Sequence, residues 1–260
     1  MFLARRTIMR SRSAILGVIL VCLVVSVDAQ IVNIEQERIS SKDSTGWFGD
    51  AGIGFSASRT TKSHVAFEIK TGLQFKTRKS LFLLITDFAA VNADGEEFVN
   101  RGFGHLRFNT KLNKVIRWEA FIQGQYNKLT KVGQRYLVGT GPRFKLTPYE
   151  NAKFYWGVSY MYEYEEVIDP LETNRDHRLS SYLSFTLAPQ DNVSLTSTTY
   201  VQPRVDYFAD YRLFNENVLE VSITGNLSLE LHFTVGYDAF PPEGVPNVTY
   251  VTANGLTYEF

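Results

Sequence analysis

The sequence predicts an all-β fold, a single antiparallel transmembrane β-barrel of about twelve strands. Apolar and polar residues alternate with a period of two along most of the chain, which is the pattern of a strand with one apolar and one polar face. Most alternating segments run 11 to 15 residues, whereas strands of globular proteins average about 5 to 6. An N-terminal export signal precedes them.

Residues 1–29 have the three parts of a secretory signal peptide. Four arginines within residues 5–12 form the basic start, and residues 14–27 are uncharged and mostly apolar. Ala29 and Gln30 flank the expected cleavage site, where small side chains precede the cut. The apolar run is short for a membrane-spanning helix, which needs about 20 residues. An uncleaved anchor is therefore the less favoured alternative.

The charge balance of the whole chain differs from that of the chain without the predicted signal peptide. The whole chain has 27 Lys and Arg against 27 Asp and Glu, and residues 1–29 contain four Arg and one Asp. Residues 30–260 therefore carry 23 basic and 26 acidic groups, without a basic run. This balance argues against a nucleic-acid partner. The single cysteine, Cys22, lies in the signal, so the mature chain has no thiolate, and we expect no metal and no cofactor.

The strands follow in order from the alternating segments between turn residues. They are expected at 46–58, 64–76, 80–92, 98–112, 116–127, 134–146, 152–165, 176–188, 192–203, 210–225, 227–238 and 248–260. Segment 64–76, for example, alternates Val65, Phe67 and Ile69 with His64, Glu68 and Lys70. Segment 80–92 is apolar on both faces. Residues 30–45 are short and polar, so we expect a periplasmic tail before a barrel over residues 46–260.

The connections between these segments alternate in length. Every second connection tends to be longer, and most of these contain Asp-Gly, Pro or Gly: 59–63, 93–97, 128–133, 166–175, 204–209 and 239–247. The others are short, as at 77–79 and 113–115. Outer-membrane barrels have short periplasmic turns and longer external loops. An even number of strands then places both termini in the periplasm.

A soluble β-sandwich also alternates, but three features favour a bacterial outer-membrane barrel. The strands are long, and the polar face is rich in Gly, Ser, Gln and charges of both signs, which suits a wet lumen. Aromatic residues lie at the ends of the apolar faces, where they form interfacial girdles: Trp47, Tyr126, Tyr136, Tyr162, Tyr164, Tyr237, Tyr250 and Tyr258. The expected location is the outer membrane of a Gram-negative-type bacterium, with its lipid as surroundings.

The chain ends in alternating residues, Leu256, Tyr258 and Phe260. This ending resembles the terminal signal by which the barrel-assembly machinery recognises outer-membrane barrels, so we expect that machinery as a partner during biogenesis. The sequence sets neither the oligomeric state nor a substrate.

Four stretches resemble the domain of unknown function 481 family, the YdiY-like or salt-induced outer-membrane proteins. They are residues 46–55 (GWFGDAGIGF), 135–143 (RYLVGTGPR), 178–183 (RLSSYL) and 210–213 (DYRL). The likeness covers roughly residues 45 to 260, and the chain departs from it at residues 58–63. The resemblance implies an outer-membrane barrel without an established biochemical role and without catalytic residues.

If the apolar faces point to lipid, charged residues line the lumen. The candidate lumen charge cluster is Arg101, Arg107, Arg117, Glu119, Arg135, Arg143, Arg178, Glu68, Glu163 and Glu230. In a narrow barrel such charges either pair across the lumen or line a small pore. Unpaired buried charge is costly, so we favour a structural or envelope-stress-related barrel with a largely filled lumen. The alternative is a narrow passive pore for small ions or solutes, in which the six arginines are candidates for anion contact.

An enzyme is the second alternative, because outer-membrane phospholipase A is also a twelve-stranded barrel. That activity requires Ser and His on the lipid-facing surface. The alternation places His64, His105 and His232 on the lumen face, and His177 lies near a loop, so none is expected to meet a membrane phospholipid. We therefore expect a protein that is not an enzyme.

Overall fold

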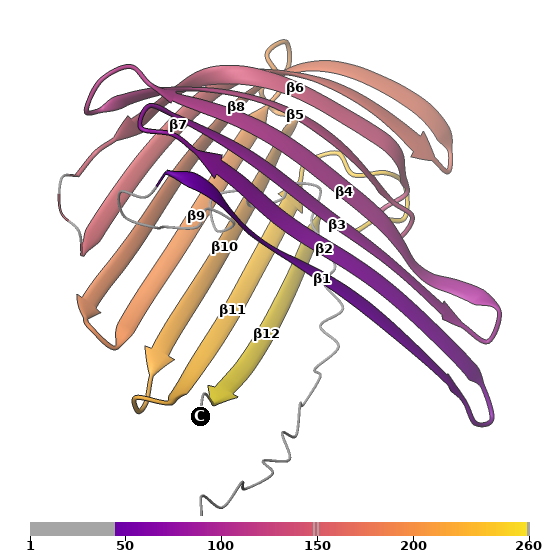
Figure 1. Ribbon diagram of the computed structural model, residues 1–260. Coiled ribbons are helices and arrows are strands. Elements are labelled where there is room, and N and C mark those ends of the chain that lie inside the picture. The colour runs from indigo at the N-terminus through magenta and orange to yellow at the C-terminus, as the bar shows by residue number, and fades with distance from the viewer. Residues whose placement is uncertain (1–44, 148, 150, 259–260) are drawn as a thin grey trace, which may run out of the picture.

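The protein is a single antiparallel sheet of twelve strands (Figure 1). The computed structural model describes residues 45–147, 149 and 151–258. The strands are β1 (Gly46–Arg59), β2 (Ser63–Lys76), β3 (Ser80–Ala93), β4 (Glu96–Lys111), β5 (Ile116–Asn127), β6 (Val132–Lys145), β7 (Ala152–Ile168), β8 (Leu171–Gln190), β9 (Val193–Pro203), β10 (Tyr211–Ser222), β11 (Leu227–Asp238) and β12 (Val248–Tyr258). The predicted fold class and the twelve strands are confirmed.

Some predictions fall on residues outside the described part of the chain. These are the signal peptide with its cleavage site at Ala29 and Gln30, the tail up to residue 44, and the terminal Phe260. Across the described residues, no helix has the length and apolarity needed to cross a membrane.

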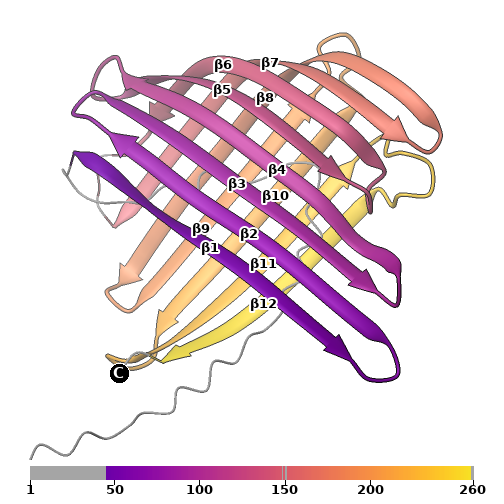
Figure 2. The ribbon, with the colours of Figure 1, turned by 45° about the vertical axis from the view of Figure 1, so that its right-hand side comes forward.

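The order of the strands in the sheet is their order in the sequence, so each connection joins neighbours. The sheet is curled: in Figure 2, β1–β4 form the front wall, β9–β12 form the wall behind, and β5–β8 join them across the top. β1 and β12 are the two edges, and no backbone pairing between described residues joins them. β1 is exposed along nearly its whole length, and its four glycines offer no side chain to pack across this seam.

Two connections differ from the sequence prediction because the strands extend further. β3 and β4 meet in a two-residue turn at Asp94 and Gly95, whose φ angles of 58° and 88° suit a tight hairpin. The predicted loop over 166–175 is mostly strand, because β7 and β8 continue pairing as far as Ile168 and Leu171. The two longest loops, 204–210 and 239–247, lie at the predicted end, which we call the loop end.

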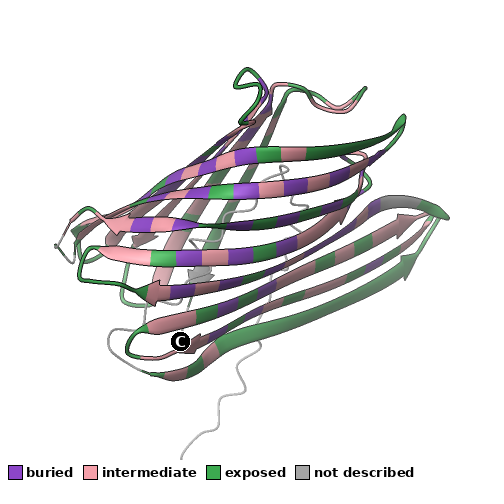
Figure 3. Ribbon diagram, turned by 90° about the horizontal axis from the view of Figure 1, so that it is seen from above, coloured by how far each residue is buried: buried purple, intermediate pink, exposed green. Residues whose placement is uncertain are grey.

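The two faces of the sheet differ as the alternation predicts. Residues of β6 and β7 are alternately buried and more exposed along the strand, a pattern visible in Figure 3. Large apolar side chains stay exposed on the outward face, among them Ile53, Phe55, Phe67, Leu106, Trp118, Ile122, Val138, Trp156, Leu183 and Phe233. The strand registers put all ten residues of the predicted lumen charge cluster on the inward face.

The inward face is less polar than the sequence predicts. Three buried apolar clusters line it: Leu83, Ile85 and Phe103; Phe121, Leu137 and Met161; and Tyr182, Tyr200 and Phe214. The first cluster explains why segment 80–92 is apolar on both faces. The interior of a narrow barrel is filled by side chains, so its wall is packed partly like a protein core rather than wetted throughout.

Candidate functional site in the barrel lumen

The loop end of the lumen holds a group of arginines and carboxylates that we call the rim cluster. Its members come from β6, β7, β8, β10 and β11 and from the β9–β10 loop: Arg135, Glu163, Glu165, Asp176, Arg178, Arg204, Asp210, Arg212 and Asp238. The side chains of Arg135, Glu163 and Arg178 are at most 2% exposed. Charges this deeply buried require partners of opposite sign.

Glu163 of β7 is the centre of the rim cluster. Arg135 donates from Nε to Glu163 Oε1 at 2.5 Å, and Nε of Arg178 lies 2.5 Å from Glu163 Oε2. Arg212 donates from Nη1 to Glu163 Oε1. Guanidinium groups from β6, β8 and β10 therefore converge on one carboxylate. Because β10 lies three strands from β7 in the sheet, the Arg212 contact runs across the lumen.

Arg212 also joins β7 to β11. Its Nη2 donates to Glu165 Oε1 at 2.9 Å, and its Nε donates to Asp238 Oδ2 at 2.9 Å. Arg178 is held in a similar way, with Nη2 3.1 Å from Asp210 Oδ1. Each of these guanidinium groups contacts several carboxylates, so the rim cluster is a connected network rather than a set of separate pairs.

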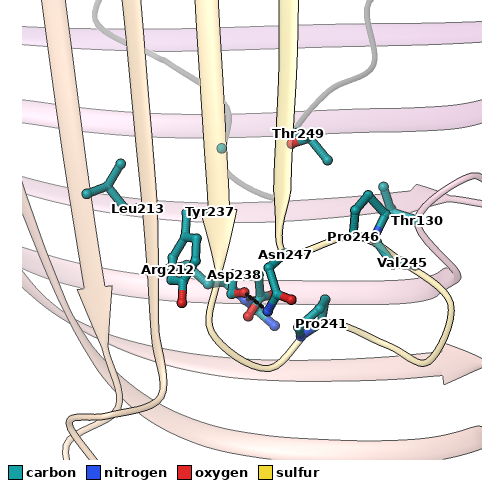
Figure 4. Close-up of a pocket in the computed structure, with 11 residues that line it drawn as sticks. Thr130, Arg212, Leu213, Tyr237, Asp238, Pro241, Val245, Pro246, Asn247 and Thr249 are labelled. Atoms are coloured by element: carbon teal, nitrogen blue, oxygen red, sulfur yellow. Dashed lines mark hydrogen bonds and ion pairs between the residues drawn. The ribbon is translucent and has the colours of Figure 1, made fainter.

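The β11–β12 loop, residues 239–247, reaches over the rim cluster. Asp238, Pro246 and Val245 line a cavity of about 30 Å³ together with Thr130 of the β5–β6 loop (Figure 4). A cavity of this size admits a water molecule, which needs about 10–15 Å³ by the same measure. The β5–β6 and β11–β12 connections are six strands apart in the sheet, so their approach narrows the mouth at the loop end.

The β9–β10 loop adds an ion pair at the edge of the rim cluster. Arg204 donates from Nη2 to Asp206 Oδ2 at 2.8 Å and from Nη1 to Asp210 Oδ2 at 3.3 Å. The hydrogen bond from Arg204 lowers the pKa of Asp206, and the same bond raises the pKa of Arg204. The loop is thus fastened to the cluster while Asp206 is ionised.

Further from the loop end lies a second group, the waist cluster, made of His105, Arg107, Glu119, Gln123, Arg143 and Tyr182. The Nη1 atoms of Arg107 and Arg143 each lie 3.5 Å from the Glu119 carboxylate. The Tyr182 hydroxyl donates to Glu119 Oε2 at 2.8 Å. Tyr182 belongs to β8 and Glu119 to β5, so this contact also crosses the lumen.

The remaining contacts of the waist cluster use neutral and aromatic groups. Arg107 donates from Nε to His105 Nε2 at 3.2 Å, which leaves His105 Nδ1 to donate to Gln123 Oε1 at 2.9 Å. The guanidinium carbon of Arg143 lies 4.0 Å from the centre of the Tyr155 ring, a favourable cation–π distance. The side chains of the waist cluster are therefore held by ion pairs, hydrogen bonds and a cation–π contact.

The structure brings six of the ten predicted lumen charges into these clusters. Arg135, Arg178 and Glu163 meet in the rim cluster, and Arg107, Arg143 and Glu119 meet in the waist cluster. The other four lie elsewhere on the inward face: Arg101 is 3.5 Å from Asp87, Glu68 is 3.0 Å from Lys70, Glu230 is 2.6 Å from His232, and Arg117 is opposite Arg143 in the register. The clustered arginines predicted for anion contact bind carboxylates of the protein.

Sequence reasoning missed six members of the rim cluster: Glu165, Asp176, Arg204, Asp210, Arg212 and Asp238. The alternating pattern of the strand predicts that Glu165 faces inward, because Glu165 lies two residues after Glu163 and therefore on the same face. The other five lie at or near the predicted strand ends, where a sequence gives little sign that a side chain turns into the lumen.

The prediction that His177 lies near a loop is wrong. β8 begins at Leu171 rather than at 176, and Asp176 and Arg178 point inward, so His177 lies on the outward face. Its Nδ1 is 2.5 Å from the hydroxyl oxygen of Tyr160. Among the described residues, no group of three or more His, Cys, Asp and Glu is arranged to hold a metal ion.

Comparisons with known proteins identify a family. The family model described as "Protein of unknown function, DUF481" matches residues 49–260. No curated protein matches the sequence significantly. Similar solved structures include the NanC porin, with 12% identity, coverage of 82% of this chain and 99% of that chain, and a TM-score of 0.46. The KdgM porin has 10% identity, coverage of 81% and 99%, and a TM-score of 0.39. The translocator domain of the autotransporter NalP from Neisseria meningitidis has 10% identity, coverage of 84% and 90%, and a TM-score of 0.40.

Proposed function

The chain belongs to the DUF481 family of proteins of unknown function, and on that premise we propose that it is a structural outer-membrane β-barrel, not an enzyme, whose lumen is closed at the loop end by the rim cluster. The observation that carries the proposal is the convergence of Arg135, Arg178 and Arg212 on Glu163. A wide aqueous channel would leave these side chains wet, whereas they are almost completely buried.

The outward face supports the membrane placement. Large apolar side chains such as Ile53, Phe55 and Ile122 are 76%, 72% and 56% exposed. A large exposed apolar surface of this kind is costly in water and favourable in lipid. Strands of 11 to 20 residues are long enough to cross the hydrocarbon layer, which takes about 9–11 tilted residues. The predicted signal peptide supplies the route of export.

The proposal is tested by conductance of the refolded chain in planar lipid bilayers. We expect little conductance from the unaltered protein. Arg212→Ser removes the side chain that joins β10 to β7 and should raise the conductance. Glu230→Gln is the matched control, because Glu230 faces the lumen outside the rim cluster, and it should change nothing. Steady conductance by the unaltered protein that Arg212→Ser does not increase would overturn the proposal.

A narrow passive pore is the second candidate, and one observation favours it. On the inward face of β2, β10 and β11, the side chains of Lys70, Glu220 and Glu230 are exposed rather than buried. A wet path along these strands would bypass the rim cluster. In that case the unaltered protein conducts small ions, and Glu230→Gln alters its ion selectivity while Arg212→Ser does not.

A further inference from the structure

A polar patch interrupts the apolar outward face in the middle of β9 and β10. Its four members, here called the amide patch, are Ser197, Thr199, Asn215 and Asn217. Asn215 pairs in register with Thr199, and Asn217 pairs with Ser197. They face outward because their neighbours Arg212 and Phe214 point into the lumen, and successive side chains of a strand alternate.

Apolar residues surround the amide patch on all sides. Leu183 and Phe185 of β8 lie beside its β9 members, and Phe233 and Val235 of β11 lie beside its asparagines. Leu183 and Phe233 are 44% and 47% exposed. The patch therefore lies at mid-strand, at the depth where a membrane offers hydrocarbon and no hydrogen-bonding partner.

The amide patch satisfies only part of its own hydrogen-bonding capacity. Asn215 donates from Nδ2 to Thr199 Oγ1 at 2.9 Å, and Asn217 donates from Nδ2 to Asn215 Oδ1 at 2.5 Å. Within the described part of the chain, no donor bonds the carbonyl oxygen of Asn217. An amide carbonyl accepts hydrogen bonds, and its amide nitrogen carries two donor hydrogens.

Two other outward polar pairs are each joined by a hydrogen bond. Trp118 donates from Nε1 to Thr140 Oγ1 at 2.8 Å, and Trp156 donates from Nε1 to Ser181 Oγ at 3.1 Å. The amide patch differs from these two pairs, because no donor among the described residues bonds the carbonyl oxygen of Asn217.

We propose that the amide patch is the surface through which the barrel binds a second copy of this chain within the membrane. The proposal goes beyond the structural role proposed above but rests on the same membrane placement. Lipid tails have neither donors nor acceptors, so lipid leaves the amides unsatisfied. An amide is donor and acceptor at once, so two identical patches facing each other across a two-fold axis are complementary. Ser197 is small and only 5% exposed, and small residues let neighbouring walls approach closely.

Disulfide cross-linking in isolated outer membranes tests this inference. The only cysteine of the full chain is Cys22, so a Cys22→Ser background makes an introduced thiol unique. Asn217→Cys should form a disulfide-linked dimer under mild oxidation. The control is Ile122→Cys on β5, an outward position that is 56% exposed on a different wall, and it should stay monomeric. Failure of Asn217→Cys to cross-link, or equal cross-linking at both positions, overturns the inference.

A second set of variants removes the patch while keeping a reporter. Leu219→Cys, on the same face of β10, should also cross-link to a second copy, and adding Asn215→Leu and Asn217→Leu should abolish that dimer. Heat-modifiable migration on gels checks that each variant is folded. A dimer that persists in the leucine variant overturns the inference. A monomer located in the outer membrane contradicts only this inference, whereas a chain absent from that membrane contradicts the proposed function as well.

Discussion

The Tyr182 side chain can extend across the lumen because the residue opposite it, Gly157, has no side chain. The two residues are opposite each other in the β7–β8 register, and a Cβ added to Gly157 would overlap the Tyr182 ring. The hydroxyl of that ring donates to Glu119 Oε2 at 2.8 Å. The missing side chain on β7 therefore lets a residue of β8 reach a carboxylate of β5.

Gly157→Ala should accordingly destabilise the barrel. The added methyl group has to displace the Tyr182 ring, and overpacking of this kind costs about 1–3 kcal/mol of the free energy of unfolding. Urea unfolding of protein refolded into lipid vesicles measures the change. Gly52→Ala is the matched control, because Gly52 is an inward glycine of β1 whose added Cβ meets no atom within 4 Å. Equal effects of the two substitutions would contradict this account.

Among the elements, the connections at the loop end differ most from what their sequences predict. The β7–β8 hairpin is longer than predicted because backbone pairing continues to Ile168 and Leu171. The β9–β10 loop is held by side chains as well as by backbone hydrogen bonds, with Arg204 bound to Asp206 and Asp210. The ion pairs of the β9–β10 loop depend on pH, whereas backbone hydrogen bonds do not.

The β9–β10 loop should loosen in acid. The hydrogen bond from Arg204 lowers the pKa of Asp206, so the ion pair is fully present above the ordinary aspartate pKa of about 3.9. It is lost only as the pH falls through the lowered pKa. An NMR titration of the Asp206 carboxyl carbon in detergent micelles should have a midpoint below that ordinary value. Arg204→Gln should return the midpoint to it, and an unshifted midpoint in the unaltered protein would refute the ion pair.

For the molecule as a whole, the neutral composition is an average of two unlike parts. Residues 1–29 contain four Arg and one Asp, and the remainder has 23 basic against 26 acidic groups. In the remainder, the charges gather on the inward face, and the large exposed side chains of the outward face are apolar. This division between two faces is what a barrel in lipid requires.

The mature chain purified from the outer membrane should begin at Gln30. Intact-mass spectrometry should return the mass of residues 30–260. Ala29→Glu places a charged side chain where the cleavage site needs a small one, so this variant should accumulate as the uncleaved chain. A membrane-bound protein with the mass of residues 1–260 would support the anchor alternative instead.

Much of the fold could be predicted because alternation is a local property. The strand over 227–238 begins and ends where predicted, and Glu163 and Arg178 face inward as their positions in the alternating pattern imply. His177 shows where the prediction failed: the start of its strand was placed five residues late, and a residue expected near a loop lies well inside the strand, on the outward face. Strand ends are set by pairing with a neighbour, which a single segment does not record.

The sequence by itself determined the twelve strands, the two unlike faces and the identity of most lumen charges, because a period of two assigns each residue to a face without reference to the rest of the chain. Only the tertiary structure decided which charges meet. Arg212 reaches Glu163 from three strands away, and Tyr182 reaches Glu119 across the same interval. Such contacts depend on the curvature of the whole sheet and on the stagger between strands distant in sequence, and these are properties of the assembled sheet.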